Sequence, residues 1–198
     1  MDICVFGDSI THGASDYKKG GWVERLKAYC MEKYADVSIY NLGISGDTSS
    51  GVLRRFKVEA EEREPDITIF AVGINDSRYA ESKEKRQVSA DVFEKNLAKL
   101  LFLSRKIADK VMFVGLTEVD ESKTMPILCD IERYYDNESV REYNGIIENC
   151  CEKNDVEYVS MKGVVVADDL EDGLHPNSHG HEKMFQAVLK KLDTHLHF

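Results

Sequence analysis

The sequence of 198 residues lacks the features that mark several other classes of protein. No apolar run approaches the ~20 residues that a membrane-spanning helix needs, so we expect no membrane insertion. No CxxC pair occurs, and the odd, irregularly spaced set of cysteines argues for reduced thiols rather than a disulfide framework or a zinc site. That set is Cys4, Cys30, Cys129, Cys150 and Cys151. Residues 1–7 lack the basic region of a signal peptide and predict a strand, so we expect a cytoplasmic protein.

The chain also has fewer basic than acidic residues. The chain has 26 Lys and Arg against 36 Asp and Glu, a formal net charge of −10. Such a surface repels phosphate backbones and anionic membranes, so we expect no nucleic-acid partner. With only 3 prolines, 13 glycines and no Ser-rich run or internal repeat, nothing marks an interdomain linker. Length and composition therefore indicate a single domain over residues 1–198.

Short apolar or β-branched runs alternate with helical patterns along the chain. The runs lack strict polar alternation, which is typical of strands covered on both faces; they span residues 3–6, 37–42, 67–72, 111–116 and 156–159. Apolar residues at three- and four-residue steps predict helices between and after these strands. This order favours a parallel sheet with helices on both faces and right-handed crossovers. Ligands bind at the carboxyl ends of the strands in such folds.

Two glycine-containing motifs follow the first two predicted strands. In Gly7-Asp8-Ser9-Ile10-Thr11, a serine just beyond a buried strand would face the ligand crevice as a nucleophile. Alone, this motif is more typical of a helix cap or a turn. The second motif surrounds Gly46, where the backbone could approach a ligand and point N–H groups at an anion. Its alternative is a turn followed by a helix that Asp47 or a nearby serine caps.

Two further motifs carry side chains suited to acyl transfer. Asn75 directly follows the third strand and could donate its amide to a developing oxyanion, although Asn-Asp also forms Asx-turns readily. In Asp172-Gly173-Leu174-His175-Pro176, the three-residue separation lets the carboxylate reach His175 Nδ1 and leaves Nε2 free as a general base. A purely structural pair at a helix entry is the alternative. Jointly, the four motifs supply a nucleophile, an oriented base and oxyanion donors.

The sequence resembles the SGNH hydrolases, the GDSL-type esterases and lipases. The name residues of that family match Ser9, Gly46, Asn75 and His175, and its acid residue matches Asp172. Ile10 stands where the family name has leucine. The resemblance implies a flavodoxin-like three-layer α/β/α sandwich with a five-stranded parallel sheet. It also implies a catalytic triad of Ser9, Asp172 and His175.

The same resemblance implies an oxyanion hole formed by the backbone N–H groups of Ser9 and Gly46 and the side chain of Asn75. The expected activity is hydrolysis of small or medium soluble acyl esters, with a small-molecule ester as the partner and no cofactor. A sugar O-acetyl esterase and a lysophospholipase or thioesterase of the same mechanism stay open. A non-catalytic binding module and a metal-dependent phosphohydrolase using Asp8, Asp76 and the histidines are less favoured alternatives. The sequence leaves the oligomeric state open.

A metal site is not expected around His175, His179 and His181. The last two are two residues apart at a helix start and would point in different directions. No cysteine or paired carboxylate completes a zinc-type ligand set.

The long connection over residues 117–137 has two interpretations. Connections of this length in compact domains are often lids or binding loops, and this one mixes acids with apolar residues that could cover an acyl pocket. A surface loop with a short helix is equally consistent with the sequence.

Overall fold

The computed structural model describes residues 1–34, 36–128 and 130–195. Its centre is a parallel five-stranded sheet in the order β2-β1-β3-β4-β5. The strands are β1 (Asp2–Gly7), β2 (Ser38–Gly43), β3 (Ile67–Ala71), β4 (Lys110–Val114) and β5 (Glu157–Val159). Every predicted strand is present, and no strand end differs from its predicted position by more than two residues. The strand order is that of a flavodoxin-like sheet, so the predicted three-layer fold is confirmed.

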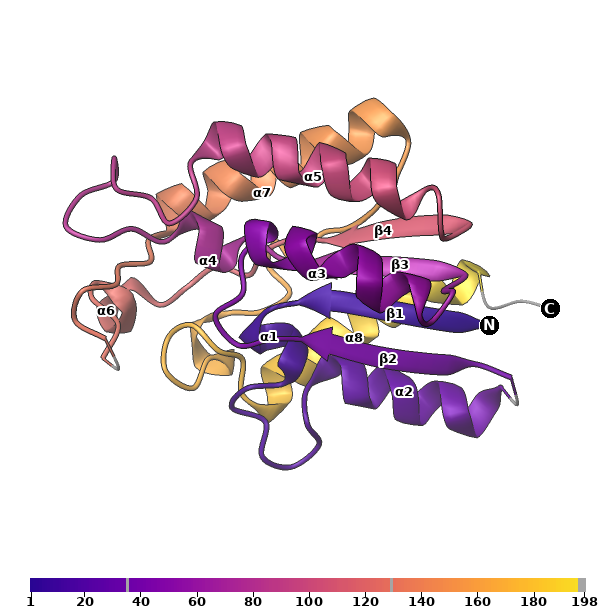
Figure 1. Ribbon diagram of the computed structural model, residues 1–198. Coiled ribbons are helices and arrows are strands. Elements are labelled where there is room, and N and C mark those ends of the chain that lie inside the picture. The colour runs from indigo at the N-terminus through magenta and orange to yellow at the C-terminus, as the bar shows by residue number, and fades with distance from the viewer. Residues whose placement is uncertain (35, 129, 196–198) are drawn as a thin grey trace.

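Helices cover both faces of this sheet (Figure 1). One layer contains α3 (Ser49–Glu61), α5 (Ala90–Ser104) and α7 (Asn137–Asn154), and the other contains α2 (Trp22–Lys33) and α8 (Ser178–Leu192). The short elements are α1 (Ser9–His12), α4 (Ile74–Ser77), α6 (Glu121–Thr124) and the 3₁₀ turns Ala167–Asp169 and Asp193–His195. A five-strand sheet with two helical layers leaves both of its faces buried, as the continuous apolar strands require.

Aromatic rings connect the sheet to the α3 layer. Phe6 on β1 lies 5.0 Å from Phe56 on α3, and Phe70 on β3 lies 5.1 Å from Phe113 on β4, measured between ring centroids. All four rings are fully buried. Offset and edge-to-face contacts at these separations stabilise the core beyond the burial of area alone. They fix the strands whose carboxyl ends carry the polar motifs.

The described cysteines are buried free thiols: Cys4, Cys30, Cys150 and Cys151. Burial raises the pKa of the Cys4 and Cys151 thiols to about 12, so both are protonated and unreactive at neutral pH. Cys129 lies outside the described residues. None of the helices in the described ranges has the length and apolarity to cross a bilayer.

Candidate active site

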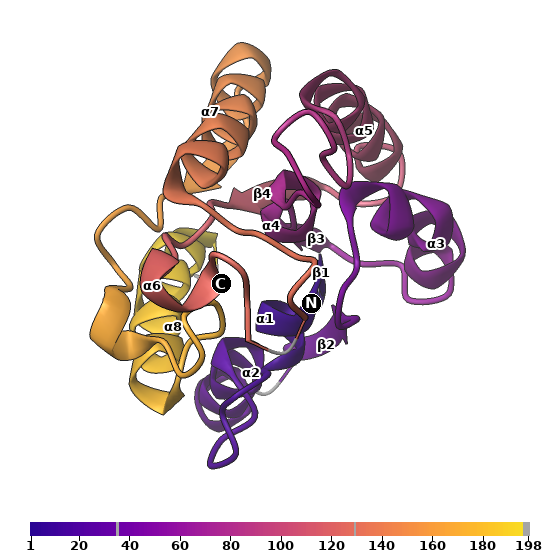
Figure 2. The same ribbon diagram turned by 90° about the vertical axis from the view of Figure 1, so that its left-hand side faces the viewer.

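The four motifs meet at the carboxyl edge of the sheet, which Figure 2 views face on. α1 follows β1 and α4 follows β3 there, while the loop after β2 and the loop before α8 close the same edge. A cavity of about 240 Å³ is lined by residues from each motif, namely Ser9, Gly46, Asn75 and His175. The structure therefore brings together the side chains and backbone that the sequence placed in four separate segments.

Ser9 is the first residue of α1, a four-residue helix where the sequence analysis expected only a turn or a cap. Asp8 is the cap: its Oδ1 accepts from the N–H of Ile10 at 2.9 Å. Gly13 ends the helix in the left-handed conformation, with φ 96°. A helix this short has no apolar periodicity, so the sequence pattern could not reveal it. The cap holds Ser9 at the end of β1, where 8 % of the residue is exposed.

A continuous chain of polar contacts runs from Ser9 to Asp172. Ser9 Oγ lies 2.8 Å from His175 Nε2, and His175 Nδ1 lies 2.7 Å from Asp172 Oδ2. Burial opposes ionisation of Asp172, but hydrogen bonds from the His175 ring and from backbone N–H groups outweigh it and hold the pKa of this carboxyl below its usual range. An ionised Asp172 carboxylate can only accept hydrogen bonds, so Nδ1 of His175 carries the ring proton. Nε2 of His175 therefore accepts a hydrogen bond from the Ser9 hydroxyl.

The turn that carries this pair depends on Gly173. Its φ is +90°, and a Cβ there would lie 2.7 Å from Lys123 Cβ on α6. Asp172 Oδ1 accepts from the backbone N–H of His175 at 2.8 Å, which closes the turn. The three-residue spacing seen in the sequence is therefore a compact turn that places Asp172 against His175 and His175 against Ser9.

Asn75 lies on α4, and its amide is held at both ends by other segments. Nδ2 donates to the Asp47 carbonyl at 2.9 Å, and Oδ1 accepts from the Tyr135 hydroxyl at 3.1 Å. These partners are distant in sequence, so the side chain does not form the Asx-turn that was the alternative. The second Nδ2 hydrogen has no acceptor among the described residues, and Asn75 lines the cavity. The Tyr135 hydroxyl donates a hydrogen bond, so the Asn75 amide atom that faces it is the oxygen and not the nitrogen.

The loop that carries Gly46 reaches the cavity with φ +79° at this glycine, the left-handed region that glycine adopts without strain. The helix after it is capped by Thr48, whose side chain accepts from the N–H of Gly51. This corrects the alternative in which Asp47 or a nearby serine was the cap. Asp47 instead accepts from Arg55 Nε at 2.9 Å, and this ion pair anchors the loop to α3.

The 117–137 segment, for which the sequence left a binding loop and a surface loop open, contributes residues to the site. Between α6 and α7 it crosses the carboxyl edge of the sheet in front of α1 (Figure 2). Ile127, Arg133 and Tyr135 from this segment line the cavity that holds Ser9. No motif singled out Tyr135, because its role depends on a contact 60 residues away in sequence. The segment also contains the expected short helix, α6.

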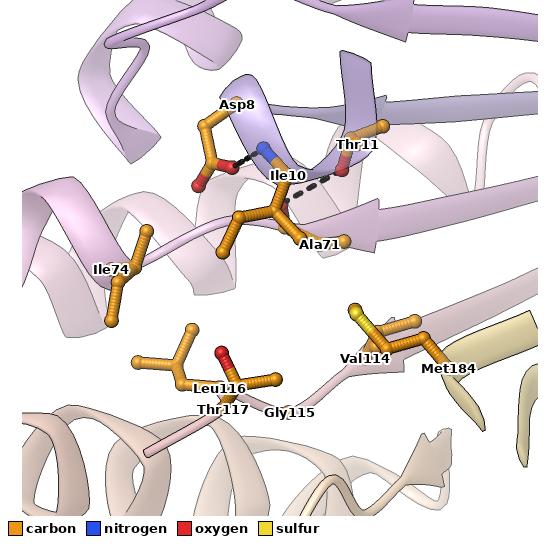
Figure 3. A pocket seen from close by; sticks show the side chains of 10 residues that line it. All are labelled: Asp8, Ile10, Thr11, Ala71, Ile74, Val114, Gly115, Leu116, Thr117 and Met184. Carbon is orange, nitrogen blue, oxygen red and sulfur yellow. Dashed lines mark hydrogen bonds between the residues drawn. The ribbon is translucent and has the colours of Figure 1, made fainter. Parts of the chain in front are cut away.

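Asp8 and Asp76 are the buried carboxyls next to these residues. Burial raises the pKa of Asp8 to about 7 and that of Asp76 to about 6. Asp76 accepts from the backbone N–H and the hydroxyl of Ser49, which joins α4 to α3. Asp8 borders a second, smaller cavity of about 20 Å³, which is otherwise mostly apolar and includes Thr117 (Figure 3). Both carboxyls therefore stabilise the turns of the site.

We expect Asp8→Asn to change how stability depends on pH. The unfolded chain releases the Asp8 proton near pH ~4, whereas the folded chain holds it to about pH 7. The folded state thus binds more protons in this window, and the part of the unfolding free energy due to Asp8 falls as pH rises through it. Asparagine keeps the acceptor for Ile10 without the charge. The stability of the variant relative to wild type should rise by roughly 2–3 kcal/mol between about pH 5 and about pH 8.

Urea unfolding at both pH values measures this difference. Asp109→Asn is the matched control, because Asp109 is exposed and lies near the amino end of β4, at the opposite edge of the sheet. A difference between Asp8→Asn and wild type that stayed constant with pH would contradict a raised pKa at Asp8.

The histidines before and in α8 serve different purposes. His179 is exposed, with 71 % of its side chain accessible, whereas His181 is buried. His181 Nδ1 accepts from the backbone N–H of Trp22, and Nε2 lies 3.0 Å from the Ala14 carbonyl. They point in different directions, as their spacing predicts. Over the described ranges, no group of three or more His, Cys, Asp or Glu side chains is placed to hold a metal ion.

Solved structures share this fold at low sequence identity. An acetylxylan esterase, Axe2, from Geobacillus stearothermophilus is 19 % identical with a TM-score of 0.76; the match covers 96 % of this chain and 93 % of that one. LAE5, an α/β hydrolase from the metagenome of Lake Arreo, Spain, is also 19 % identical with a TM-score of 0.77; coverage is 97 % and 94 %. No curated protein sequence gives a significant match.

By its fold, the protein is thus an α/β/α sandwich of the kind found in these hydrolases. The chain belongs to the GDSL-like lipase/acylhydrolase family, whose model matches residues 5–183. It is therefore a carboxylic ester hydrolase, and the resemblance to the SGNH hydrolases is confirmed.

Proposed function

We propose that this chain hydrolyses esters of small or medium acyl groups through an acyl-enzyme on Ser9. The observation that carries the proposal is the contact chain from Asp172 through His175 to Ser9 at the wall of the 240 Å³ cavity. A serine within hydrogen-bond reach of an oriented imidazole is the arrangement that activates a hydroxyl nucleophile. The cavity has room for a short acyl chain beside the nucleophile.

His175 Nε2 removes the proton of Ser9 as Oγ attacks the ester carbonyl. The new C–O bond forms as the carbonyl π electrons move to oxygen, and the resulting imidazolium is stabilised by the Asp172 carboxylate. Collapse of the tetrahedral intermediate breaks the bond to the alcohol, which takes the proton from His175. Water then attacks the acyl-enzyme by the same route, which releases the acid and restores Ser9.

The oxyanion hole would consist of the backbone N–H groups of Ser9 and Gly46 and the free Nδ2 hydrogen of Asn75. Ser9 is the first residue of α1, so its N–H has no acceptor within that helix. Donors fixed in advance stabilise the charge that develops on the carbonyl oxygen without reorganising during the reaction. The contacts of Asn75 with Asp47 and Tyr135 provide this fixation.

A sugar O-acetyl ester is the second candidate substrate, and it is supported by the fold shared with the Geobacillus acetylxylan esterase. In that enzyme, the variants described as catalytic replace a serine, an aspartate and a histidine, and the last two are three positions apart. Asp172 and His175 have the same spacing. We also propose that residues 1–198 form one domain, since the fold match covers 96 % of the chain. The buried free thiols support the expected cytoplasmic setting.

The test combines hydrolysis with active-site labelling. Wild-type protein should hydrolyse 4-nitrophenyl acetate in the presence of EDTA, and a fluorophosphonate should form one adduct, which peptide mass spectrometry maps to Ser9. Acyl-length series and acetylated xylo-oligosaccharides then rank the candidate substrates. An adduct on another residue, or hydrolysis that stops with EDTA, would contradict the mechanism.

A further inference from the structure

Arginine side chains line the cavity at Ser9, although the protein as a whole is acidic. Two arginines line it, Arg78 and Arg133, and no carboxylate from the described ranges does so. The complete chain carries a net charge of −10. Asp130 pairs with Arg133, so Arg78 supplies the positive charge at this position that no carboxylate of the described ranges neutralises. A cavity lined by one sign of charge attracts ligands of the other sign.

Arg78 differs from the other cations around it because it lacks an acidic partner. Arg133 Nε lies 2.6 Å from Asp130 Oδ2, and Arg86 Nη2 lies 3.2 Å from Glu142 Oε2. Within the described ranges, Arg78 pairs with no carboxylate. Its guanidinium interacts instead with the neutral hydroxyl of Tyr135.

The backbone holds Arg78 at the site. Arg78 directly follows α4, the helix that carries Asn75, and its carbonyl accepts from the N–H of Gln87 at 2.9 Å. Its side chain is partly buried. Arg78 therefore lies three residues after the proposed oxyanion donor and lines the same cavity as Ser9.

A second cavity of about 300 Å³ adjoins the first. Arg78 and Arg133 line both, so the arginines lie where the two cavities meet. The second cavity is lined by the basic residues Lys85 and Arg86 and by two acidic residues, Asp130 and Glu132. A substrate with its ester carbonyl at Ser9 could therefore extend past the arginines into a second, polar region.

The chemistry of ester cleavage does not require this cation. The oxyanion has its own donors, and proton transfer is assigned to His175. A partly buried guanidinium without an acidic partner carries a desolvation cost that a bound anion would offset. Its planar fork matches the two oxygens of a carboxylate or phosphate group.

We propose that Arg78, with Arg133 beside it, binds an anionic group of the substrate, so that the enzyme prefers esters that carry a carboxylate or phosphate. This inference rests on the proposed function, because the preference concerns substrates of the Ser9 site. It assigns Arg78 as the specificity-determining residue. Arg133 contributes less, since Asp130 already neutralises it.

Matched pairs of anionic and neutral esters test the preference. The first pair is 4-acetoxybenzoate and 4-acetoxybenzamide, with the charge on the alcohol side. The second is the 4-nitrophenyl monoester of adipic acid and that of adipamic acid, with the charge on the acyl side. In at least one pair, the wild-type kcat/KM should favour the anion by about tenfold to a hundredfold at low salt. Salt should reduce that ratio.

The Arg78→Gln variant should lose most of this ratio, and Arg133→Gln should lose a smaller part. Arg105→Gln is the matched control: it removes an exposed arginine at the end of α5 and should leave the ratio as in wild type. If the first pair shows the preference, calorimetry gives a readout without turnover. It compares the binding of 4-hydroxybenzoate and 4-hydroxybenzamide to the Ser9→Ala protein.

The possible failures are distinguishable. Hydrolysis of the neutral esters without an anionic preference, or a preference that Arg78→Gln retains, would overturn the role of Arg78 and leave the esterase proposal standing. No hydrolysis of any ester, neutral or anionic, would overturn the proposed function itself.

Discussion

Ser9→Ala is expected to abolish ester hydrolysis, with a loss of kcat of about 10⁶-fold. Oγ is the proposed attacking atom, and no neighbouring side chain replaces it between His175 and the cavity. The fold should be retained, because Asp8 still caps α1 and the substitution removes one atom from a residue that is 8 % exposed. Kinetics with 4-nitrophenyl acetate, together with thermal unfolding, measure both effects.

Ser38→Ala is the control for this variant. Ser38 is exposed at the amino end of β2, on the opposite edge of the sheet from Ser9, so its loss should leave kcat unchanged. Ser9→Ala should also lose fluorophosphonate labelling. Retention of more than about one hundredth of the wild-type kcat in a folded Ser9→Ala protein would contradict the nucleophile assignment, since such losses are normally far larger.

Asn75→Ala should lower kcat by about 10²–10³-fold, the usual effect of removing one oxyanion donor. KM should change less, because the negative charge that Asn75 stabilises develops only in the transition state. Loss of the hydrogen bond to the Asp47 carbonyl should cost about 1 kcal/mol of stability. Separate measurement of kcat, KM and unfolding distinguishes the catalytic from the structural effect.

Asn154→Ala is the matched control, because Asn154 also donates to a backbone carbonyl, that of Cys150, but at the end of α7. It should affect stability and leave kcat unchanged. Tyr135→Phe should give a smaller loss than Asn75→Ala, about twofold to tenfold in kcat, since it removes the hydrogen bond that orients the amide and the contact with Arg78 but keeps the amide itself. Full kcat in a folded Asn75→Ala protein would show that Asn75 is not an oxyanion donor.

The accuracy of the sequence analysis varied with the length of the element. Strands and long helices contain enough apolar residues to define a period, and all five strands were found. The four-residue helices α1 and α4 were missed, although they carry Ser9 and Asn75. Their position depends on caps and on contacts with other segments. The local motifs identified the residues, but not the element that presents them.

The residues that support the site were the hardest to predict. Tyr135 and Arg78 belong to no motif, and their importance depends on what they contact in three dimensions. Asp8 stood in a motif, but its raised pKa comes from burial that the sequence does not show. The Arg86 guanidinium donates to the Ser77 carbonyl and pairs with Glu142, contacts that its local sequence does not indicate.

The sequence by itself determined the fold class, the family and the set of residue types needed for acyl transfer. These follow from local patterns, because apolar periods set the elements and short motifs keep their order along the chain. Only the tertiary structure decided which of those residues meet, which carboxyls lose their solvent and which arginine at the cavity has no carboxylate partner in the described ranges. Such properties depend on contacts between segments far apart in sequence. The net charge of −10 describes the whole chain, whereas the structure places two arginines at the cavity of Ser9.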